Sequence, residues 1–308
     1  MKIEEYKRYT DGYKEQIDAE LKKILGELNY SAEFKEVLEY ALFPSGKRLR
    51  PILMLEWHNL FAPADYYALR YACGLEILHT YSLIHDDMPC MDNDDYRRGK
   101  LTVHKKYGEG TALLAGDALL DLAYRILSMP TPSFEVGPFW MFKELCGDMG
   151  LIQGQYCDLY GKIDNLNDLL DMCRHKTGAL IKLACISGYA LGNNLDYKKC
   201  NAIMGAQPGG TKDSADVSSD VSNDGLLLNY VLASGFGEAF GAAFQLYDDI
   251  SEYIDGEKIS STSVMNYVDL DEAKKMLNTL LGDAADTLEP LSGDTTYLRE
   301  LLNRFIIV

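Results

Sequence analysis

Apolar residues recur at helical spacing along most of this chain, and this pattern constrains the fold more than any other feature. Phe236, Phe240, Phe244 and Tyr247 follow an i, i+4, i+8, i+11 pattern, which places them on one face of a helix. Segments such as LLDLAYRILSM and LDEAKKMLNTLL are amphipathic in the same way, and no convincing pair of alternating strands is found. Helices joined by short loops predict an all-α protein built as a helical bundle.

The segment from Gln207 to Asn223 interrupts this pattern. It reads QPGGTKDSADVSSDVSN, is rich in Gly, Ser and Asp, and has almost no large apolar side chain to bury. It therefore predicts a flexible surface loop at 207–223 between two helices, and a functional lid is the alternative interpretation. No repeat and no boundary in composition divides the remainder, so we expect one domain over residues 1–308.

The chain is acidic, with a formal net charge of −17. Such a charge repels nucleic acid and anionic membranes, so a phosphate-bearing ligand requires locally concentrated cations. The N-terminus MKIEEYKRYT has no apolar signal region, and the apolar stretch from Tyr230 to Tyr247 is interrupted by Glu238 and predicts a buried helix. We therefore expect no nucleic-acid partner and no stable membrane insertion. The cysteines are odd in number and form no C-x-x-C pair, which indicates reduced thiols in a cytoplasmic protein.

A dense group of carboxylates follows an apolar helix in the sequence SLIHDDMPCMDNDDYRRGK. The first acidic cluster consists of Asp86, Asp87 and Asp92. Pro89 is expected to end or distort the helix, so that the chain folds back and lets Asp92 approach Asp86. Magnesium takes oxygen ligands and commonly binds through one or two carboxylates plus substrate phosphates.

Two adjacent arginines, Arg97 and Arg98, follow this cluster directly. Arginine binds phosphate in a bidentate manner, so carboxylates for a metal next to guanidinium groups for phosphate indicate a metal-diphosphate site. A solvated acidic loop is the alternative interpretation, and so is mutual neutralisation of the two charge blocks.

A second acidic cluster ends another apolar helix in the sequence FQLYDDISE. It consists of Asp248, Asp249 and Glu252. Asp248 and Glu252 are spaced i, i+4 and therefore share a helix face. Two such clusters facing each other across a cavity could hold several magnesium ions around one diphosphate.

Two short basic segments and one histidine complete the candidate site. GKRLRP contains Lys47 and Arg50 and precedes a helix expected to begin near Ile52, with Pro51 as its first residue. Backbone amides and these cations would bind an anion, or the segment is an exposed basic loop.

The other basic segment is HKTG, from His175 to Gly178, where Lys176 and Thr177 offer a cation and a hydroxyl at the start of a buried helix. Taken alone, it would most often be a helix cap. His79 lies about two helical turns before Asp86 and is either a satisfied core residue or a ligand contact.

These residues resemble the trans-isoprenyl diphosphate synthase (polyprenyl synthetase) family along nearly the whole chain. The most specific stretch is HTYSLIHDDMPCMDNDDYRRGKLTVHKKYGEGTALLAGDALL, and KTGALI, GLIQGQYCDL and AFQLYDD also match. The resemblance implies the isoprenoid synthase helical bundle around a central cavity. It also implies a homodimer, several magnesium ions (three in the expected arrangement), and a reaction between isopentenyl diphosphate and an allylic diphosphate.

The resemblance also implies roles for individual residues. The metal ligands would be Asp86, Asp87, Asp92, Asp248, Asp249 and Glu252. Isopentenyl diphosphate would be bound by Lys47, Arg50, His79 and Arg98. The allylic diphosphate, where catalysis takes place, would be held by Arg97, Lys176, Thr177 and Gln245. Bulk just before the first cluster limits product length in the family, so Tyr81 and Ser82 indicate a short product, farnesyl diphosphate first and geranylgeranyl diphosphate next.

The region around the second cluster departs from the family pattern. Glu252 replaces the usual aspartate, and the following sequence EYIDGEKISSTSVMNYVDLDEAKK lacks about a dozen residues that carry lysines in the family. Lys258 is a candidate replacement for one missing cation, whereas Ser261 takes the place of the other. Three hypotheses follow: an active short-chain prenyltransferase, a non-catalytic member that binds diphosphate or a partner subunit, and a terpene cyclase-like enzyme. The set of Lys47, Arg50, His79 and Arg98 argues against the last, because a cyclase needs no isopentenyl diphosphate site.

Overall fold

The protein is described by a computed structural model over residues 1–43, 46–131, 139–195, 199, 224–256 and 259–307. Every long element in these ranges is a helix, which confirms the predicted all-α class. The sequence did not predict the short antiparallel pair formed by β1 (Tyr96–Arg97) and β2 (Lys100–Leu101). The predicted loop at 207–223 lies outside the described residues.

The chain divides into two compact units. The N-terminal unit comprises residues 2–55 and 64–129, and the C-terminal unit comprises residues 56–63 and 130–308. One helix, α3 (Leu49–Asn59), begins in the first unit and ends in the second. The prediction of a single domain over the whole chain stays a prediction.

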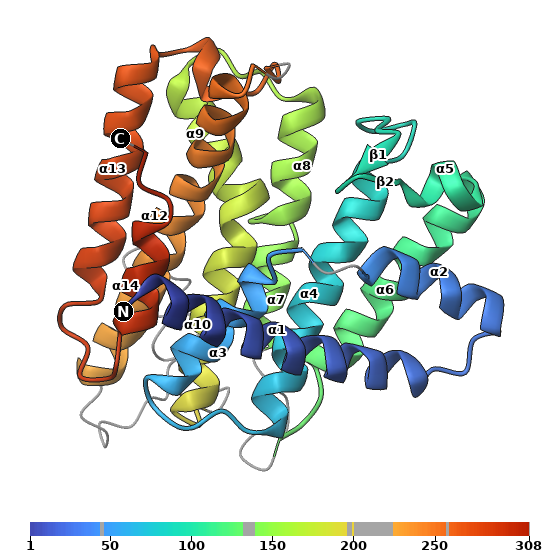
Figure 1. Ribbon diagram of the computed structural model, residues 1–308, viewed down its shortest axis with the longest axis horizontal. Coiled ribbons are helices and arrows are strands. Elements are labelled where there is room, and N and C mark those ends of the chain that lie inside the picture. The colour runs from blue at the N-terminus through green and yellow to red at the C-terminus, as the bar shows by residue number, and fades with distance from the viewer. Residues whose placement is uncertain (44–45, 132–138, 196–198, 200–223, 257–258, 308) are drawn as a thin grey trace, which may run out of the picture. The chain divides into compact units, whose positions relative to one another are not determined.

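The N-terminal unit is organised around α4, which packs against α6, α1 and α2 (Figure 1). Its helices are α1 (Ile3–Gly26), α2 (Ala32–Leu42), α4 (Tyr66–Asp86), α5 (Val103–Tyr107) and α6 (Glu109–Leu127). α4 is apolar on nearly all sides, which is typical of a helix buried in a core. It begins where the Asp65 carboxylate accepts a hydrogen bond from the Ala68 amide at 2.9 Å, an N-cap that satisfies an otherwise unpaired donor.

The C-terminal unit is organised around the long α12, which packs against α10 and α13. Its elements are α7 (Phe139–Cys146), α8 (Leu151–Tyr160), α9 (Leu166–Cys173), η1 (Arg174–Gly178), α10 (Ala179–Gly192), α12 (Asp224–Ile254), η2 (Val264–Asn266), α13 (Leu270–Thr287) and α14 (Thr296–Asn303). Phe236 and Phe240 are fully buried, as the sequence pattern predicts. Gly237 lets α12 approach α10 closely, because a Cβ there would lie 2.4 Å from the Lys182 Cα.

The apolar stretch from Tyr230 to Tyr247 lies within α12, and the predicted helix is confirmed. Residues Gly225–Ile254 are long and apolar enough to span a membrane by length and composition, and half of their most apolar window is buried inside the protein.

Candidate active site

The end of α4 carries the first acidic cluster on a reversing chain. α4 ends at Asp86, three residues before Pro89, and the Asp92 amide then donates a hydrogen bond to the Asp86 carbonyl at 2.9 Å. Asn93 adopts a left-handed conformation (φ 56°), and its amide bonds to the Met88 carbonyl at 3.1 Å. The predicted return of Asp92 to Asp86 is therefore confirmed.

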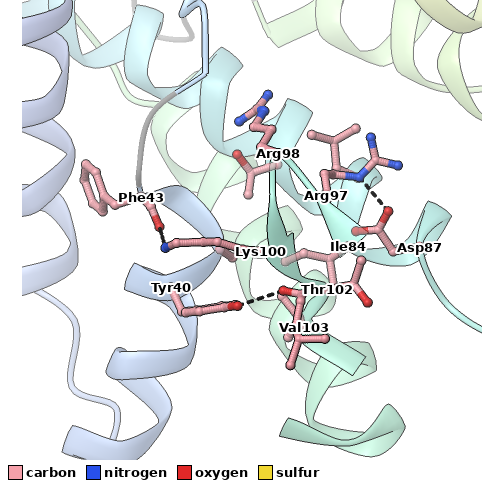
Figure 2. A pocket seen from close by; sticks show the side chains of 13 residues that line it. Tyr40, Phe43, Ile84, Asp87, Arg97, Arg98, Lys100, Thr102 and Val103 are labelled. Atoms are coloured by element: carbon pink, nitrogen blue, oxygen red, sulfur yellow. Dashed lines mark hydrogen bonds and ion pairs between the residues drawn. The ribbon is translucent and has the colours of Figure 1, made fainter. Parts of the chain in front are cut away.

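Asp87 is more buried than Asp86 and Asp92, the other members of the first acidic cluster. Its side chain is buried, and its Oδ1 atom accepts a hydrogen bond from Arg97 Nε at 2.5 Å (Figure 2). Burial raises the pKa of the Asp87 carboxyl to about 6, although the adjacent positive charge of Arg97 opposes that rise. Asp87 and Arg97 therefore neutralise each other, as the alternative interpretation expected. Arg97 also lies 3.7 Å from Asp94.

Arginines from two separate segments of the N-terminal unit place positive charge around His79. Burial lowers the pKa of His79 well below its ordinary value, and the positive charges of Arg50, Arg98, Arg97 and Arg48 lower it further. The Arg98 guanidinium lies against Gly46, where an added Cβ would come within 2.5 Å of Arg98 Cζ. The N-terminal unit therefore brings together the GKRLRP segment, His79 and the arginine pair, as expected for an anion site.

The lowered pKa of His79 gives a pH prediction with a definite sign. As pH falls through about 6.5, the unfolded chain takes up a proton on this residue that the folded chain does not, so folding becomes less favourable. Between about pH 7.5 and about pH 5.5 we expect wild type to lose about 1 kcal/mol more unfolding free energy than His79→Gln, since the slope for one group is at most about 1.4 kcal/mol per pH unit. Urea titrations of both proteins at the two pH values measure this, and equal losses would contradict it.

Arg48 has a role that the sequence analysis did not assign. It is 2% exposed and adopts a left-handed conformation (φ 51°). Its guanidinium donates to Glu76 Oε1 at 2.7 Å, to Asp18 Oδ1 at 2.9 Å and to the Leu42 carbonyl at 2.8 Å. Arg48 therefore holds in place the segment that carries Lys47 and the start of α3, where Arg50 lies. The available signal in the sequence was Glu76, an acid within an otherwise apolar helix.

The expected start of the next helix needs correction. α3 begins at Leu49 rather than near Ile52, and Pro51 is its third residue. The first four amides of a helix have no partner within that helix, so a proline there removes no hydrogen bond. Arg50 consequently lies in the first helical turn.

In the C-terminal unit, Lys176 and Thr177 lie in a π-helical turn, η1, between α9 and α10. The interpretation of HKTG as a helix cap is therefore wrong, because the helix continues through it. Such a turn re-aims side chains and is frequent at functional sites. Lys176 Nζ lies 2.5 Å from Asp158 Oδ2 on α8, and Gly154 permits this approach because a Cβ there would lie 2.2 Å from the Lys176 amide nitrogen.

A chain of hydrogen bonds links this turn to the second acidic cluster. Thr177 Oγ1 donates to Gln245 Oε1 at 2.9 Å, and Gln245 Nε2 donates to Asp249 Oδ1 at 2.9 Å. The Val264 amide donates to Asp249 Oδ2 at 2.8 Å. The family resemblance implied a role for Gln245 and for Thr177 but no contact between them, and the structure shows that they are hydrogen-bonded to each other.

The members of the second cluster differ in burial. Asp248 is half-buried and Glu252 is exposed on the same face of α12, whereas Asp249 is 6% exposed. Burial raises the pKa of the Asp249 carboxyl, which its bonds to Val264 and Gln245 oppose. Through its hydrogen bond from the Val264 amide, Asp249 holds the segment that follows α12. Lys258 lies outside the described residues, and Ser261 lies in an exposed turn.

The donor chemistry of both clusters fits magnesium. Carboxylate oxygens are the ligands it prefers, and it commonly uses one or two of them with substrate phosphates and water completing the shell. Among the described residues, no three His, Cys, Asp or Glu side chains are placed to enclose a metal ion by themselves.

Comparison with known proteins agrees with this chemistry. The sequence pattern of the polyprenyl synthetase family matches residues 31–206. The farnesyl diphosphate synthase of Micrococcus luteus is 32% identical over 88% of each chain. The chain belongs to the polyprenyl synthetase family. The matched residues 31–206 include the first acidic cluster and HKTG and end before the second cluster.

Other members of the family match over similar lengths. The dimethylallyltranstransferase of Fischerella ambigua is 32% identical over 92% of this chain and 78% of its own. Among solved structures, the geranyltransferase from Legionella pneumophila has a TM-score of 0.78 at 26% identity, covering 98% of this chain and 96% of that one. The FPP/GFPP synthase from Zymomonas mobilis also has a TM-score of 0.78, at 28% identity and with 98% and 99% covered. The predicted isoprenoid synthase fold is confirmed.

Proposed function

We propose that this family member is a magnesium-dependent prenyltransferase that condenses isopentenyl diphosphate with dimethylallyl or geranyl diphosphate. The product is a short-chain prenyl diphosphate, farnesyl diphosphate. The observation that carries this proposal is the group of cations around His79 beside the first acidic cluster. Relatives named for farnesyl diphosphate synthesis and dimethylallyl transfer support it.

The binding roles follow from charge. Isopentenyl diphosphate lies on Lys47, Arg50, His79 and Arg98, where guanidinium groups match its phosphate oxygens. A bound diphosphate offsets the mutual repulsion of these cations. The allylic diphosphate is held by Arg97, Lys176, Thr177 and Gln245. Lys176 is already oriented by Asp158, and Thr177 by Gln245.

Magnesium is held by carboxylates from both clusters. The proposed ligands, which would supply oxygens for three ions, are Asp86, Asp87, Asp92, Asp248, Asp249 and Glu252. Since the Asp87 oxygen is bonded to Arg97 and the Asp249 oxygens to Gln245 and Val264, an ion at either residue competes with those donors. When bound, magnesium supplies positive charge where the leaving diphosphate develops negative charge.

The reaction proceeds by loss of the allylic diphosphate. The bond between the allylic C1 and oxygen breaks, and the electron pair leaves with the diphosphate, whose charge Arg97, Lys176 and the Thr177 hydroxyl stabilise. The double bond of isopentenyl diphosphate attacks the allylic cation, which forms the new carbon–carbon bond and leaves a tertiary cation. That cation loses a proton from C2 to the released diphosphate, and the electrons of the broken C–H bond form the double bond of the product. Apolar walls protect the cation from water.

The enzyme is a cytoplasmic homodimer in this proposal. The six cysteines among the described residues are free thiols, as expected in a reducing compartment. On α6, Leu113 and Leu114 are 47% and 59% exposed, and apolar side chains of this size favour burial against a second copy.

Product analysis of the wild-type protein tests the proposed function. The protein is incubated with labelled isopentenyl diphosphate and geranyl diphosphate, with magnesium or with excess chelator. The expected result is a labelled fifteen-carbon diphosphate that forms only with magnesium. Binding of both substrates without turnover would instead support a non-catalytic member, and consumption of the allylic substrate alone would support a cyclase.

Tyr81 gives a prediction about product length. It is 7% exposed, one turn before the first acidic cluster, and its ring meets the His85 ring edge-on at 5.7 Å. We expect Tyr81→Ala to shift the main product from fifteen to twenty carbons or more, because it removes a bulky side chain that closes the space for the growing chain. Chromatography of the dephosphorylated products measures this. Tyr81→Phe keeps the bulk and is expected to keep the wild-type product, whereas an unchanged length in Tyr81→Ala would contradict the role. Ser82 is a weaker candidate, since its hydroxyl already bonds to the His79 carbonyl at 2.8 Å.

A further inference from the structure

The hairpin that carries the two arginines is held to the end of α2 by a reciprocal pair of contacts. Lys100 Nζ on β2 donates to the Phe43 carbonyl at 3.0 Å, and Tyr40 Oη on α2 donates to the Leu101 carbonyl at 2.8 Å (Figure 2). The Lys100 ammonium also lies 4.7 Å from the centre of the Tyr40 ring, within the range of a cation–π interaction. We call Tyr40 and Lys100 the hairpin clamp.

We infer that the hairpin clamp positions Arg98 for binding isopentenyl diphosphate, and this inference rests on the proposed function. Each clamp residue bonds to the backbone next to the other: Tyr40 bonds to β2, which carries Lys100, and Lys100 bonds to the end of α2, which carries Tyr40. Neither residue contacts substrate in this proposal, so both are positioning residues.

The hairpin needs such support because it is very short. β1 and β2 have two residues each, and an isolated two-stranded ribbon is marginal in water. Its turn requires Arg98 at φ 53° and Gly99 at φ 76°, and the left-handed conformation is unfavourable for a residue with a side chain. The backbone at Arg98 is therefore held by surrounding contacts rather than by its own preference.

Side chains do not completely fill the space beneath the hairpin, so the clamp supplies part of the hairpin's support. A small hollow of about 60 Å³ lies between the hairpin and α4, with Leu83, Ile84 and Val103 among its lining residues. It holds only a few water molecules at most. This hollow is also lined by Tyr40, Phe43, Lys100 and Leu101. The two hydrogen bonds of the clamp therefore join the hairpin to α2 beside a space that side chains do not fill.

The clamp sets the spacing between the two halves of the isopentenyl diphosphate site. Phe43 lies three residues before Gly46, and Lys100 lies two residues after Arg98. The Arg98 guanidinium in turn lies against Gly46. The bond between Phe43 and Lys100 therefore lies close in sequence to both sides of the contact between Gly46 and Arg98. Arg97 has a second anchor in Asp87, so the allylic side depends less on the clamp.

Steady-state kinetics on clamp variants test the inference. Lys100→Met and Tyr40→Phe are each expected to raise the KM for isopentenyl diphosphate about tenfold, roughly the free energy of one lost hydrogen bond. The KM for geranyl diphosphate and kcat are expected to change less than about twofold. Lys100→Arg keeps a cation and a donor and is expected to restore the wild-type KM.

Matched controls lie next to the clamp. Lys105 pairs with Asp95 at 2.7 Å, and the Tyr107 hydroxyl bonds to Glu36 at 3.2 Å, so Lys105→Met and Tyr107→Phe make the same chemical changes outside the clamp. Both are expected to keep wild-type KM values. Clamp variants with an unchanged KM for isopentenyl diphosphate, or with both KM values raised equally, would overturn the inference.

Hydrogen exchange separates this test from that of the proposed function. Lys100→Met is expected to speed exchange of the backbone amides at residues 96–102 relative to Lys105→Met, whether or not the protein is active. If wild type catalyses no condensation, the proposed function fails while faster exchange still supports the clamp. Equal exchange in the two variants would overturn the clamp even in an active enzyme.

Discussion

Asp86→Asn is expected to lower kcat by about 10³-fold, the largest effect of any single substitution in the site. The change keeps the shape of the side chain but removes the charge that is proposed to hold magnesium. Loss of one ion's stabilisation of the leaving diphosphate is worth several kcal/mol, and each ~1.4 kcal/mol is tenfold in rate. Initial rates of labelled product at saturating isopentenyl and geranyl diphosphate measure it.

The matched control is Asp95→Asn, the same change in the same reversing chain. Asp95 is exposed and pairs with Lys105, away from the Asp92–Asp86 contact. We expect its kcat to stay within about threefold of wild type, as for surface substitutions in general. Equal losses in both variants would mean that the whole acidic loop acts through its net charge, and the assignment of Asp86 as a ligand would fail.

Arg48→Met is expected to destabilise the folded protein by about 3–5 kcal/mol. The substitution leaves Glu76 buried without the cation that compensates it, and breaking a buried ion pair from one side has a cost of this size. The Leu42 carbonyl loses its donor as well. Urea unfolding followed by circular dichroism measures the change, together with a lower midpoint of thermal unfolding.

The neighbouring Lys47→Met provides the comparison for this prediction. Lys47 is exposed, so we expect its substitution to change stability by less than about 0.5 kcal/mol while raising the KM for isopentenyl diphosphate. The two substitutions thus distinguish the structural role of Arg48 from the proposed binding role of Lys47. Equal stability of the two variants would show that the Arg48 ion pairs contribute little to the fold.

Local sequence rules predicted the parts of the site that depend on chain direction and helix periodicity. Pro89 predicted the reversal that returns Asp92 to Asp86, and the i, i+4 spacing predicted the shared face of Asp248 and Glu252. The all-helical fold followed from the apolar spacing, because a helix face is a local property.

These local rules could not predict contacts between segments that are distant in the sequence. Arg48 and Arg50 are the same residue type two positions apart, yet one is buried against Glu76 and Asp18 and the other faces His79. The π-helical turn at Lys176 depends on packing against Gly154, and the bond from Asp249 to Val264 depends on how the chain after α12 returns. Tertiary packing selects these arrangements, and no local pattern encodes them.

The most direct test of the account is a kinetic cycle of wild type, Asp86→Asn, Asp248→Asn and the double variant. If both acidic clusters serve the departure of one allylic diphosphate, the two substitutions remove parts of the same stabilisation, and the loss in kcat of the double variant should fall at least tenfold short of the product of the single losses. A double variant whose loss equals that product would contradict the claim that the two clusters act together.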